Sequence, residues 1–252
     1  MPPIVLHLGV AKDVSQALPK LEILRRRAGS FYLGATAPDI RLITGTARQD
    51  THFVDLALPE GASGVAEMFR TYPNLAQGSN LDDASRAFVA GYLSHLLTDE
   101  VWISQVYKPY FGADSNERPG ERAITQMLDR ALQYELDLRE RDPQTMADVR
   151  KAIEEEPSTW SIPFLGGDNL AKWRDFVVNA TRSQRSWDRF SQYARDFLVA
   201  QGKVTKEAVE AFLGNFGDMR ERILNYVPAP ELRRFREESV ERSVVAIREY
   251  LE

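Results

Sequence analysis

The hydrophobic and polar positions of this chain follow a helical period over most of its length. The clearest example is AFVAGYLSHLLTDEVW, residues 87–102, where apolar side chains recur at steps of three and four. This apolar stripe is wide, which predicts a helix largely enclosed by the rest of the protein. Asn80 or Asp82 is suited to cap its N-terminus. The chain shows no alternating strand pattern of useful length and no internal repeat, so the sequence predicts an all-α fold.

The same periodicity predicts the remaining helices and the breaks between them. Helices are expected at residues 8–18, 21–27, 63–71, 121–141, 143–155, 168–200, 205–225 and 230–251, with Thr205 as a cap. Residues 41–61 are predicted to be irregular, and residues 107–120, rich in proline and glycine, to be a loop. Pro38 disfavours helix at Ala37 and places Asp39 at a helix end or in a loop. A break at 157–167 separates residues 1–156 from 157–252, which we expect to pack together as one domain.

Composition and charge narrow the class of protein. The 252 residues carry a net charge of −5, which argues against a broad nucleic-acid surface. There are no cysteines, so thiol nucleophiles, disulfides and thiolate metal ligands are excluded. The N-terminus lacks the features of a signal peptide, and no run approaches the roughly 20 apolar residues of a membrane helix. A cytoplasmic protein without a transmembrane segment is therefore expected.

A histidine and an aspartate interrupt the apolar stripe of residues 87–102. His95 and Asp99 are four residues apart, so in a helix they share a face and can point at one ion. An ionised carboxylate in an apolar setting requires a positive partner, either a basic side chain or a metal ion. An H-x-x-x-D pair also arises between plain hydrogen-bonded neighbours, so the pair alone does not choose between these interpretations.

The histidines of the chain are only three, and they occur in a particular order with acidic residues. His7 is followed by YLGATAPDI with Asp39, by THF with His52, and by GYLSHLLTDEVW with His95 and Asp99. This series of motifs, over roughly residues 5–105, resembles the bacterial zinc-dependent phospholipase C family, which is itself similar to fungal single-strand nucleases. The resemblance implies a multi-helical bundle of that type in residues 1–156, with additional helices in the C-terminal region.

The resemblance also implies a metal site. By resemblance, His52, His95 and Asp99 bind one zinc ion, and His7 lies close by as a ligand of a second ion bridged by Asp99. Asp39 is either a ligand or the general base for the attacking water. Three neutral imidazoles with one or two carboxylates suit Zn²⁺ or another divalent transition metal, and they leave a position for water. Bound zinc lowers the pKa of that water to about 7 and polarises a phosphoryl oxygen.

The implied function is a metal-dependent hydrolase of phosphoric esters, either a phosphodiesterase or a phospholipase C-like enzyme, with metal-activated water as nucleophile. Its substrate would be a small phosphate ester or a phospholipid headgroup. Family members with three zinc ions use two more histidines and a glutamate downstream, but this chain has no histidine after His95, so one or two ions are expected. The alternative is a non-catalytic helical scaffold or binding protein with a structural or vestigial metal site. In a third interpretation, His95 and Asp99 are ordinary core residues paired with an arginine.

Several aromatic, basic and glycine residues are weaker candidates for a functional role. For the aromatic residues we favour packing over a substrate cleft or lid, and for the arginines a surface pair over phosphate binding. The glycines are expected to mark close contacts between helices. These residues are Tyr107, Tyr110, Phe111, Trp160, Phe164 and Trp173, then Arg118 and Arg122, then Gly34 and Gly91.

Overall fold

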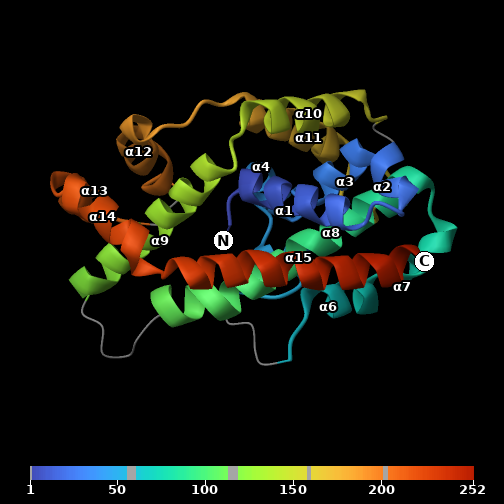
Figure 1. Cartoon of the computed structure of the whole chain (residues 1–252), viewed down its shortest axis with the longest axis horizontal. Coiled ribbons are helices and arrows are strands. Elements are labelled where there is room, and N and C mark those ends of the chain that lie inside the picture. The colour runs from blue at the N-terminus through green and yellow to red at the C-terminus, as the bar shows by residue number, and fades with distance from the viewer. Residues whose placement is uncertain (1, 56–60, 113–118, 158–159, 201–203) are drawn as a thin grey trace.

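Helix α8, Asp83–Trp102, is the central element of the computed structural model, and it packs against α3 and the long helix α15 (Figure 1). Asp82 caps it, because its carboxylate accepts a hydrogen bond from the backbone N–H of Ser85 at 2.7 Å. Almost every side chain of α8 is buried, as expected for a helix with apolar residues around most of its circumference. The predicted enclosed helix and its cap are confirmed.

The structure describes residues 2–55, 61–112, 119–157, 160–200 and 204–252, and within them every regular element is a helix. The predicted all-α class is confirmed. Before α9 the elements are α1 (Ile4–Ala17), α2 (Glu22–Arg26), α3 (Ala28–Gly34), η1 (Ala37–Ile40), α4 (Arg41–Thr44), α5 (Arg48–His52), α6 (Gly64–Thr71), α7 (Pro73–Ala76), η2 (Gly78–Asn80), α8 and η3 (Ile103–Phe111). The others are α9 (Pro119–Arg139), α10 (Pro143–Glu155), α11 (Gly167–Arg182), α12 (Trp187–Tyr193), η4 (Ala194–Leu198), α13 (Lys206–Gly214), α14 (Phe216–Tyr226) and α15 (Ala229–Leu251).

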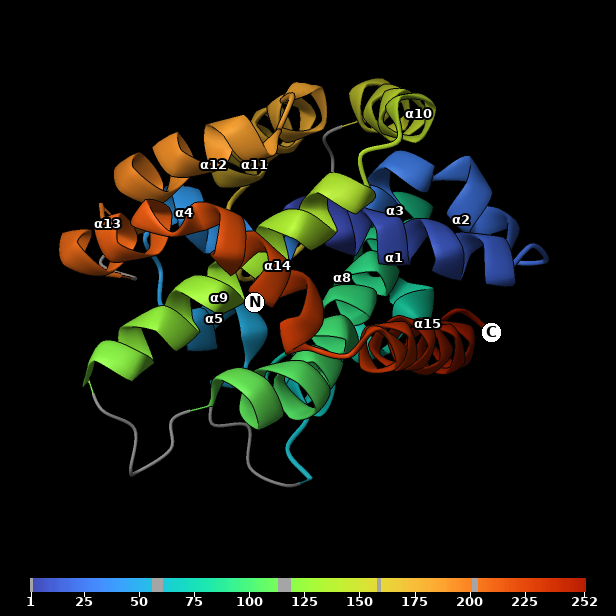
Figure 2. The same cartoon turned by 60° about the vertical axis from the view of Figure 1, so that its left-hand side comes forward.

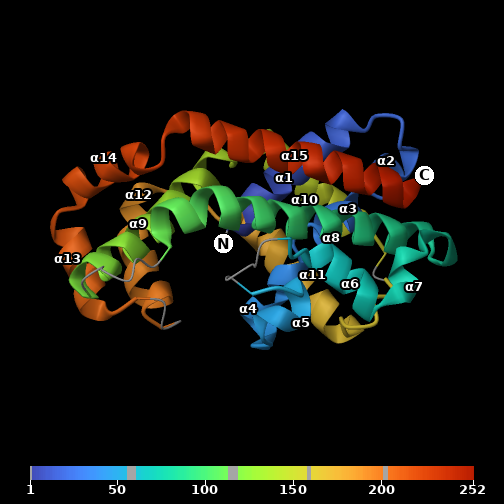
Figure 3. The ribbon, with the colours of Figure 1, turned by 90° about the horizontal axis from the view of Figure 1, so that it is seen from below.

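The hydrophobic core consists of two clusters. The first, which we call cluster one, is built by α1, α3, α8, α10 and α11 together with the C-terminal end of α15. The second, cluster two, is built by η3, α9 and α12–α14 together with the start of α15. Helices α12–α14 gather around α9 at one end of the molecule, as Figures 2 and 3 show. Helices α8 and α15 contribute side chains to both clusters and therefore connect them.

Two glycines bring α3 and α8 into close contact. A Cβ atom at Gly91 of α8 would lie 2.0 Å from the carbonyl oxygen of Phe31, and one at Gly34 of α3 would lie 2.0 Å from that of Phe88. Neither position can hold a larger side chain unless the helices move apart. The predicted close helix contact at these glycines is confirmed, and it holds α3 firmly beside the segment of α8 that carries His95.

Several element boundaries differ from the predictions. Residues 103–111 form the π-helix η3, and Val106 and Phe111 are buried in cluster two, so the prediction of a loop starting at residue 107 was wrong. Residues 113–118 lie outside the described part. Residues 41–61 were predicted to be irregular but contain α4 and α5. The expected helices 168–200 and 205–225 are each divided, at residues 183–186 and at Asn215. Serine and asparagine favour helix ends because their side chains compete with helical hydrogen bonds.

The break at residues 157–167 does not separate two cores. Helix α11, which follows it, adds Trp173 and Val177 to the same cluster as α10, which precedes it. The Thr205 cap on α13 is confirmed, since its hydroxyl accepts a hydrogen bond from the N–H of Ala208 at 3.2 Å. Within the described residues, no helix has both the length and the apolar character needed to cross a membrane.

Candidate metal centre

Five polar side chains from four separate segments meet in the interior beside α8. His95 and Asp99 lie on one face of α8, and the others come from α1, from η1 and from the end of α5. They are almost fully enclosed, with exposed fractions of 1% for His7, 8% for Asp39, 0% for His52, 0% for His95 and 2% for Asp99. These are the five residues singled out in the sequence, and the tertiary structure brings all of them together.

The local structure of each segment directs its side chain toward the others. The ring of His7 stacks on that of His95, with centroids 3.7 Å apart and planes 10° from parallel. Helix α5 ends directly after His52, where Phe53 adopts the left-handed conformation with a φ of 62°. This conformation is costly for a residue with a side chain, so it persists only where packing enforces it. Phe53 packs edge-on against the rings of Tyr72 and Phe164, which fixes the end of α5.

The potential ligand atoms lie at distances typical of a zinc coordination shell. The Nε2 atoms of His52 and His95 are 3.3 Å apart, and Oδ2 of Asp99 lies 3.2 Å and 3.7 Å from them, respectively. Nε2 of His7 is 3.5 Å from Oδ1 of Asp99, and Oδ1 of Asp39 is 3.6 Å from Nε2 of His52. Ligands about 2.0–2.1 Å from a tetrahedral ion are separated by about 3.3–3.4 Å from one another. The cluster therefore has the dimensions of a metal site.

The ligand atoms can be grouped around one or two ions. One group contains His7, His95 and Asp99, and a second contains Asp39, His52 and His95. The predicted trio of His52, His95 and Asp99 is equally tight, as the distances above show. His95 belongs to every group, while Asp99 and His52 each belong to two, so His95 is the centre of the arrangement.

The hydrogen bonds of the histidines determine which ring nitrogens are free. Nδ1 of His95 lies 2.9 Å from the carbonyl oxygen of Ala35, so it carries the proton and Nε2 keeps its lone pair. Nδ1 of His52 contacts the hydroxyl of Thr51 at 3.0 Å. Both ring nitrogens of His7 and Oδ1 of Asp99 are buried and have no hydrogen-bond partner within the described part of the chain. These three atoms are therefore free to bind a cation.

The electrostatics of the cluster favour the protonation states that ligands require. Burial lowers the pKa of His52 and holds the pKa of His95 well below its usual range, so both rings are neutral. Burial alone would favour the neutral acid of Asp99. The guanidinium of Arg48, 2.8 Å from Oδ2, outweighs the effect of burial, so the pKa of Asp99 lies well below its usual range. Neutral imidazole and ionised carboxylate are the forms that bind zinc.

Arg48 belongs to the site and was not singled out in the sequence. Its guanidinium donates to Oδ2 of Asp99 at 2.8 Å, and only 12% of its side chain is exposed. The arginine that the third interpretation required is therefore present. It satisfies Oδ2 only, and it leaves Oδ1 of Asp99 and both nitrogens of His7 without partners. The signal that could have revealed Arg48 is its position four residues before His52, on the same face of α5.

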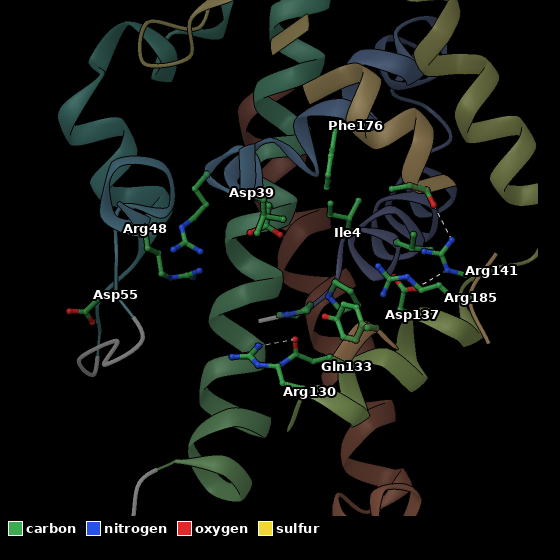
Figure 4. A pocket seen from close by; sticks show the side chains of 17 residues that line it. Ile4, Asp39, Arg48, Asp55, Arg130, Gln133, Asp137, Arg141, Phe176 and Arg185 are labelled. Atoms are coloured by element: carbon green, nitrogen blue, oxygen red, sulfur yellow. Dashed lines mark hydrogen bonds and ion pairs between the residues drawn. The ribbon is translucent and has the colours of Figure 1, made fainter. Parts of the chain in front are cut away.

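A cleft of about 790 Å³ reaches the centre from the surface, and Asp39 and Arg48 lie in its wall. Figure 4 shows these two residues on one side and Arg141, Arg185 and Asp137 on the opposite side. Five arginines and three aspartates line the cleft in a protein whose net charge is −5. The guanidinium of Arg41, another lining residue, makes no ion pair with any described residue. The cleft is suited to an anionic group near Asp39.

Those weaker candidates that the structure describes do not line the cleft. Phe111 is buried and stacks with Tyr226, and Tyr107 and Tyr110 pack on cluster two. Trp173 is buried in cluster one, and Trp160 and Phe164 pack against it, so their favoured role in the core is confirmed. Arg122 donates to the carbonyl of Phe111 at 2.7 Å, and Arg118 lies outside the described residues.

Comparison of the chain with protein-family models, with curated proteins and with solved structures gives no match.

Proposed function

We propose that this protein is a metal-dependent hydrolase of phosphoric esters, with one or two divalent ions, zinc in the first instance, held by His7, Asp39, His52, His95 and Asp99. One observation carries the proposal. Five buried side chains present ligand atoms 3.2–3.7 Å apart, and two of those atoms, Nε2 of His7 and Oδ1 of Asp99, have no hydrogen-bond partner among the described residues. Burying polar atoms without a hydrogen-bond partner costs free energy, and a cation bound between them would offset this cost.

The ion would supply the charge that activates water and polarises a phosphoryl oxygen. Of the five residues, Asp39 lines the cleft, and its carboxylate is 3.6 Å from Nε2 of His52. We infer that Asp39 either ligates the ion at the cleft side or accepts a proton from water that enters there, and its position in the cleft wall supports both roles. His95 is held by the carbonyl of Ala35, which orients its Nε2 toward the centre.

The arginines of the cleft support a phosphate substrate. Arg41 and Arg48 lie in the cleft wall together with Asp39, and a guanidinium recognises phosphate oxygens through paired hydrogen bonds. A cleft of about 790 Å³ has room for a small phosphate ester or a phospholipid headgroup. The resemblance to the zinc-dependent phospholipase C family agrees with this chemistry, and the absence of later histidines favours one or two ions rather than three.

A second candidate function is a helical scaffold with a structural metal. The observation that favours it is burial, because His7, His52, His95 and Asp99 are each at most 2% exposed. A metal enclosed by four protein ligands has no position for water and contributes to folding only.

The first test is metal content. We expect the purified wild-type protein to contain zinc in at least stoichiometric amount, and His95→Ala and Asp99→Asn to lose it. Asp129→Asn is the matched control, since Asp129 is also buried but lies on α9, outside the centre, and accepts a hydrogen bond from Gln133. Folded wild type that binds no zinc, or zinc retained by both centre variants, would contradict the site.

The second test is activity on bis-p-nitrophenyl phosphate, a chromogenic phosphocholine ester and single-stranded DNA. We expect hydrolysis of at least one of them, loss after treatment with a chelator, and recovery when zinc is added. Asp39→Asn should abolish turnover in folded protein. Bound zinc without hydrolysis, with unfolding when zinc is removed, would instead establish the structural alternative.

A further inference from the structure

A second pocket, here called the arginine pocket, adjoins the cleft and lies apart from the candidate metal centre. It has a volume of about 550 Å³ and is formed by one face of α10, the end of α11, the connection at residues 183–186 and Arg189 of α12. Five arginines line it, namely Arg141, Arg150, Arg182, Arg185 and Arg189. The described residues that line it include no aspartate or glutamate.

Two of these arginines are held rigidly at the wall shared with the cleft. Arg141 donates to Asp137 at 2.7 Å and to the carbonyl oxygens of Ala180 and Ser183 at 2.9 Å and 2.7 Å. The guanidinium of Arg185 lies over the rings of Tyr134 and Tyr193, 5.3 Å and 5.4 Å from their centroids. Side chains fixed in this way lose little conformational entropy when they bind a ligand.

The positive charge of the pocket is only partly compensated. Asp137 forms ion pairs with both Arg141 and Arg185, and Glu154 forms one with Arg182 at 2.6 Å. Arg150 forms no hydrogen bond or ion pair with any described residue. The one hydrogen bond of Arg189 to a described residue is donated to the carbonyl oxygen of Gln184, at 3.0 Å and five residues earlier in the chain. Five guanidinium groups therefore face two carboxylates.

Surface arginines usually point outward and are screened by water. Here five arginines line one pocket, from helices α10, α11 and α12 and from the connections before α10 and after α11, in a protein of net negative charge, which is the arrangement of an anion site. We propose that the arginine pocket binds a small molecule that carries two or more phosphate groups. Five cations exceed what a single phosphate needs, and the volume lies in the range of small-molecule sites.

A small ligand fits better than a nucleic acid or a membrane surface. Those partners require an extended basic face, whereas the net charge of this protein is −5 and these five arginines line a single pocket of about 550 Å³. The proposal does not depend on the hydrolase function, because none of the five metal-centre residues lines the arginine pocket.

Pyrophosphate is the probe for this site, titrated calorimetrically into chelator-treated full-length protein at constant ionic strength. We expect Arg150→Ala/Arg189→Ala to weaken pyrophosphate binding by at least about tenfold. The matched control Arg25→Ala/Arg233→Ala removes two exposed arginines from α2 and α15, and it should stay within about twofold of wild type. Inorganic phosphate should bind at least about tenfold more weakly than pyrophosphate, since it offers a single anionic group.

Thermal unfolding of both double variants checks that they are folded, and Asp99→Asn separates this proposal from the proposed function. We expect Asp99→Asn to bind pyrophosphate as wild type does. The proposal is overturned if wild type does not bind pyrophosphate, or if the two double variants bind it equally. It is also overturned if Asp99→Asn abolishes binding and the arginine pocket variant does not, because pyrophosphate would then occupy the metal centre.

Discussion

At the residue scale, the buried carboxylate of Asp99 is only partly paired by the described residues. Arg48 contacts Oδ2 at 2.8 Å. Oδ1 faces His7 at 3.5 Å and has no hydrogen-bond partner in the described part of the chain. A cation at Oδ1 would complete the pairing of Asp99, and without it Arg48 alone offsets the cost of a buried charge. The stability of the protein should therefore depend on Arg48 and on zinc together.

Arg48→Met tests this dependence. In zinc-free protein we expect it to lower the free energy of unfolding by about 3 kcal/mol, since the carboxylate of Asp99 remains buried without its partner. Added zinc should recover most of this loss, because the ion replaces the lost positive charge. Arg41→Met is the control, as Arg41 lines the same cleft without an ion pair, and it should change stability by less than about 1 kcal/mol. Urea unfolding with and without zinc measures these effects, and equal losses in both variants would contradict the role of Arg48.

The buried histidines predict a pH dependence of zinc-free protein. Burial holds the pKa of His52 and His95 below the value of the unfolded chain. As the pH falls, these histidines are therefore protonated in the unfolded state before they are protonated in the folded state. Stability should therefore fall as the pH drops below about 6.5, by up to about 1.4 kcal/mol per pH unit for each histidine. Asp99, whose pKa is lowered, adds stability above its unfolded value of about 3.9 that is lost only at lower pH.

Urea unfolding at a series of pH values between 8 and 5 measures this slope. His95→Gln removes one of the two histidines whose pKa burial lowers, and it should reduce the slope by roughly half. A wild-type protein whose stability does not change over this range would show that the histidines take up protons in the folded state.

At the scale of elements, the contact between α3 and α8 supports both the core and the metal centre. Gly91 lies against the carbonyl of Phe31 and the backbone nitrogen of Ala35. Ala35 is also the residue whose carbonyl orients His95. Any separation of the two helices should therefore displace the histidine as well as loosen cluster one.

Gly91→Ala tests this coupling. A Cβ atom 2.0 Å from the carbonyl oxygen of Phe31 must push the helices apart, so we expect a loss of about 3 kcal/mol or more and weaker zinc binding. Gly214→Ala is the matched control in α13, where nothing lies within 4 Å of the new atom, and it should change stability by less than about 1 kcal/mol. Chemical unfolding and zinc titration give the two readouts. A Gly91→Ala protein as stable as the control would contradict the close packing.

At the scale of the whole molecule, the two clusters share the helices α8 and α15. Glu100 of α8 is buried and accepts hydrogen bonds from Arg242 of α15 at 2.8 Å and from the N–H of Gly64 at 2.7 Å. This contact ties α6, α8 and α15 together close to the point where the clusters meet. The break at residues 157–167 crosses neither helix. We therefore expect the chain to unfold as one cooperative unit.

One substitution in each cluster tests this expectation. Leu170→Ala removes a buried side chain from cluster one and Ile223→Ala removes one from cluster two. Each should lower stability by about 2–5 kcal/mol and shift a single common transition. Calorimetry together with circular dichroism measures the number of transitions. Two separate transitions, each sensitive to only one of the substitutions, would show two independently folding parts.

The sequence by itself determined the features that depend on neighbouring residues. Helical periodicity, a cap at Asn80 or Asp82 and the shared face of His95 and Asp99 arise from contacts three or four residues apart, so they can be read along the chain. The order of the motifs resembles that of the zinc-dependent phospholipase C family, and this resemblance added His7, Asp39 and His52 to the predicted metal ligands. The breaks at residues 183–186 and at Asn215 were missed because serine and asparagine are weaker signals than proline or glycine.

The tertiary structure alone decided the contacts between distant residues. It stacked His7 on His95, paired Arg48 with Asp99 across 51 positions, and left Oδ1 of Asp99 without a partner. It also brought Arg141 and Arg185 from the C-terminal half of the chain opposite Asp39 (Figure 4). The physical reason is that such contacts are set by how helices pack, and packing depends on the shapes of all the helices together rather than on the spacing within any one of them.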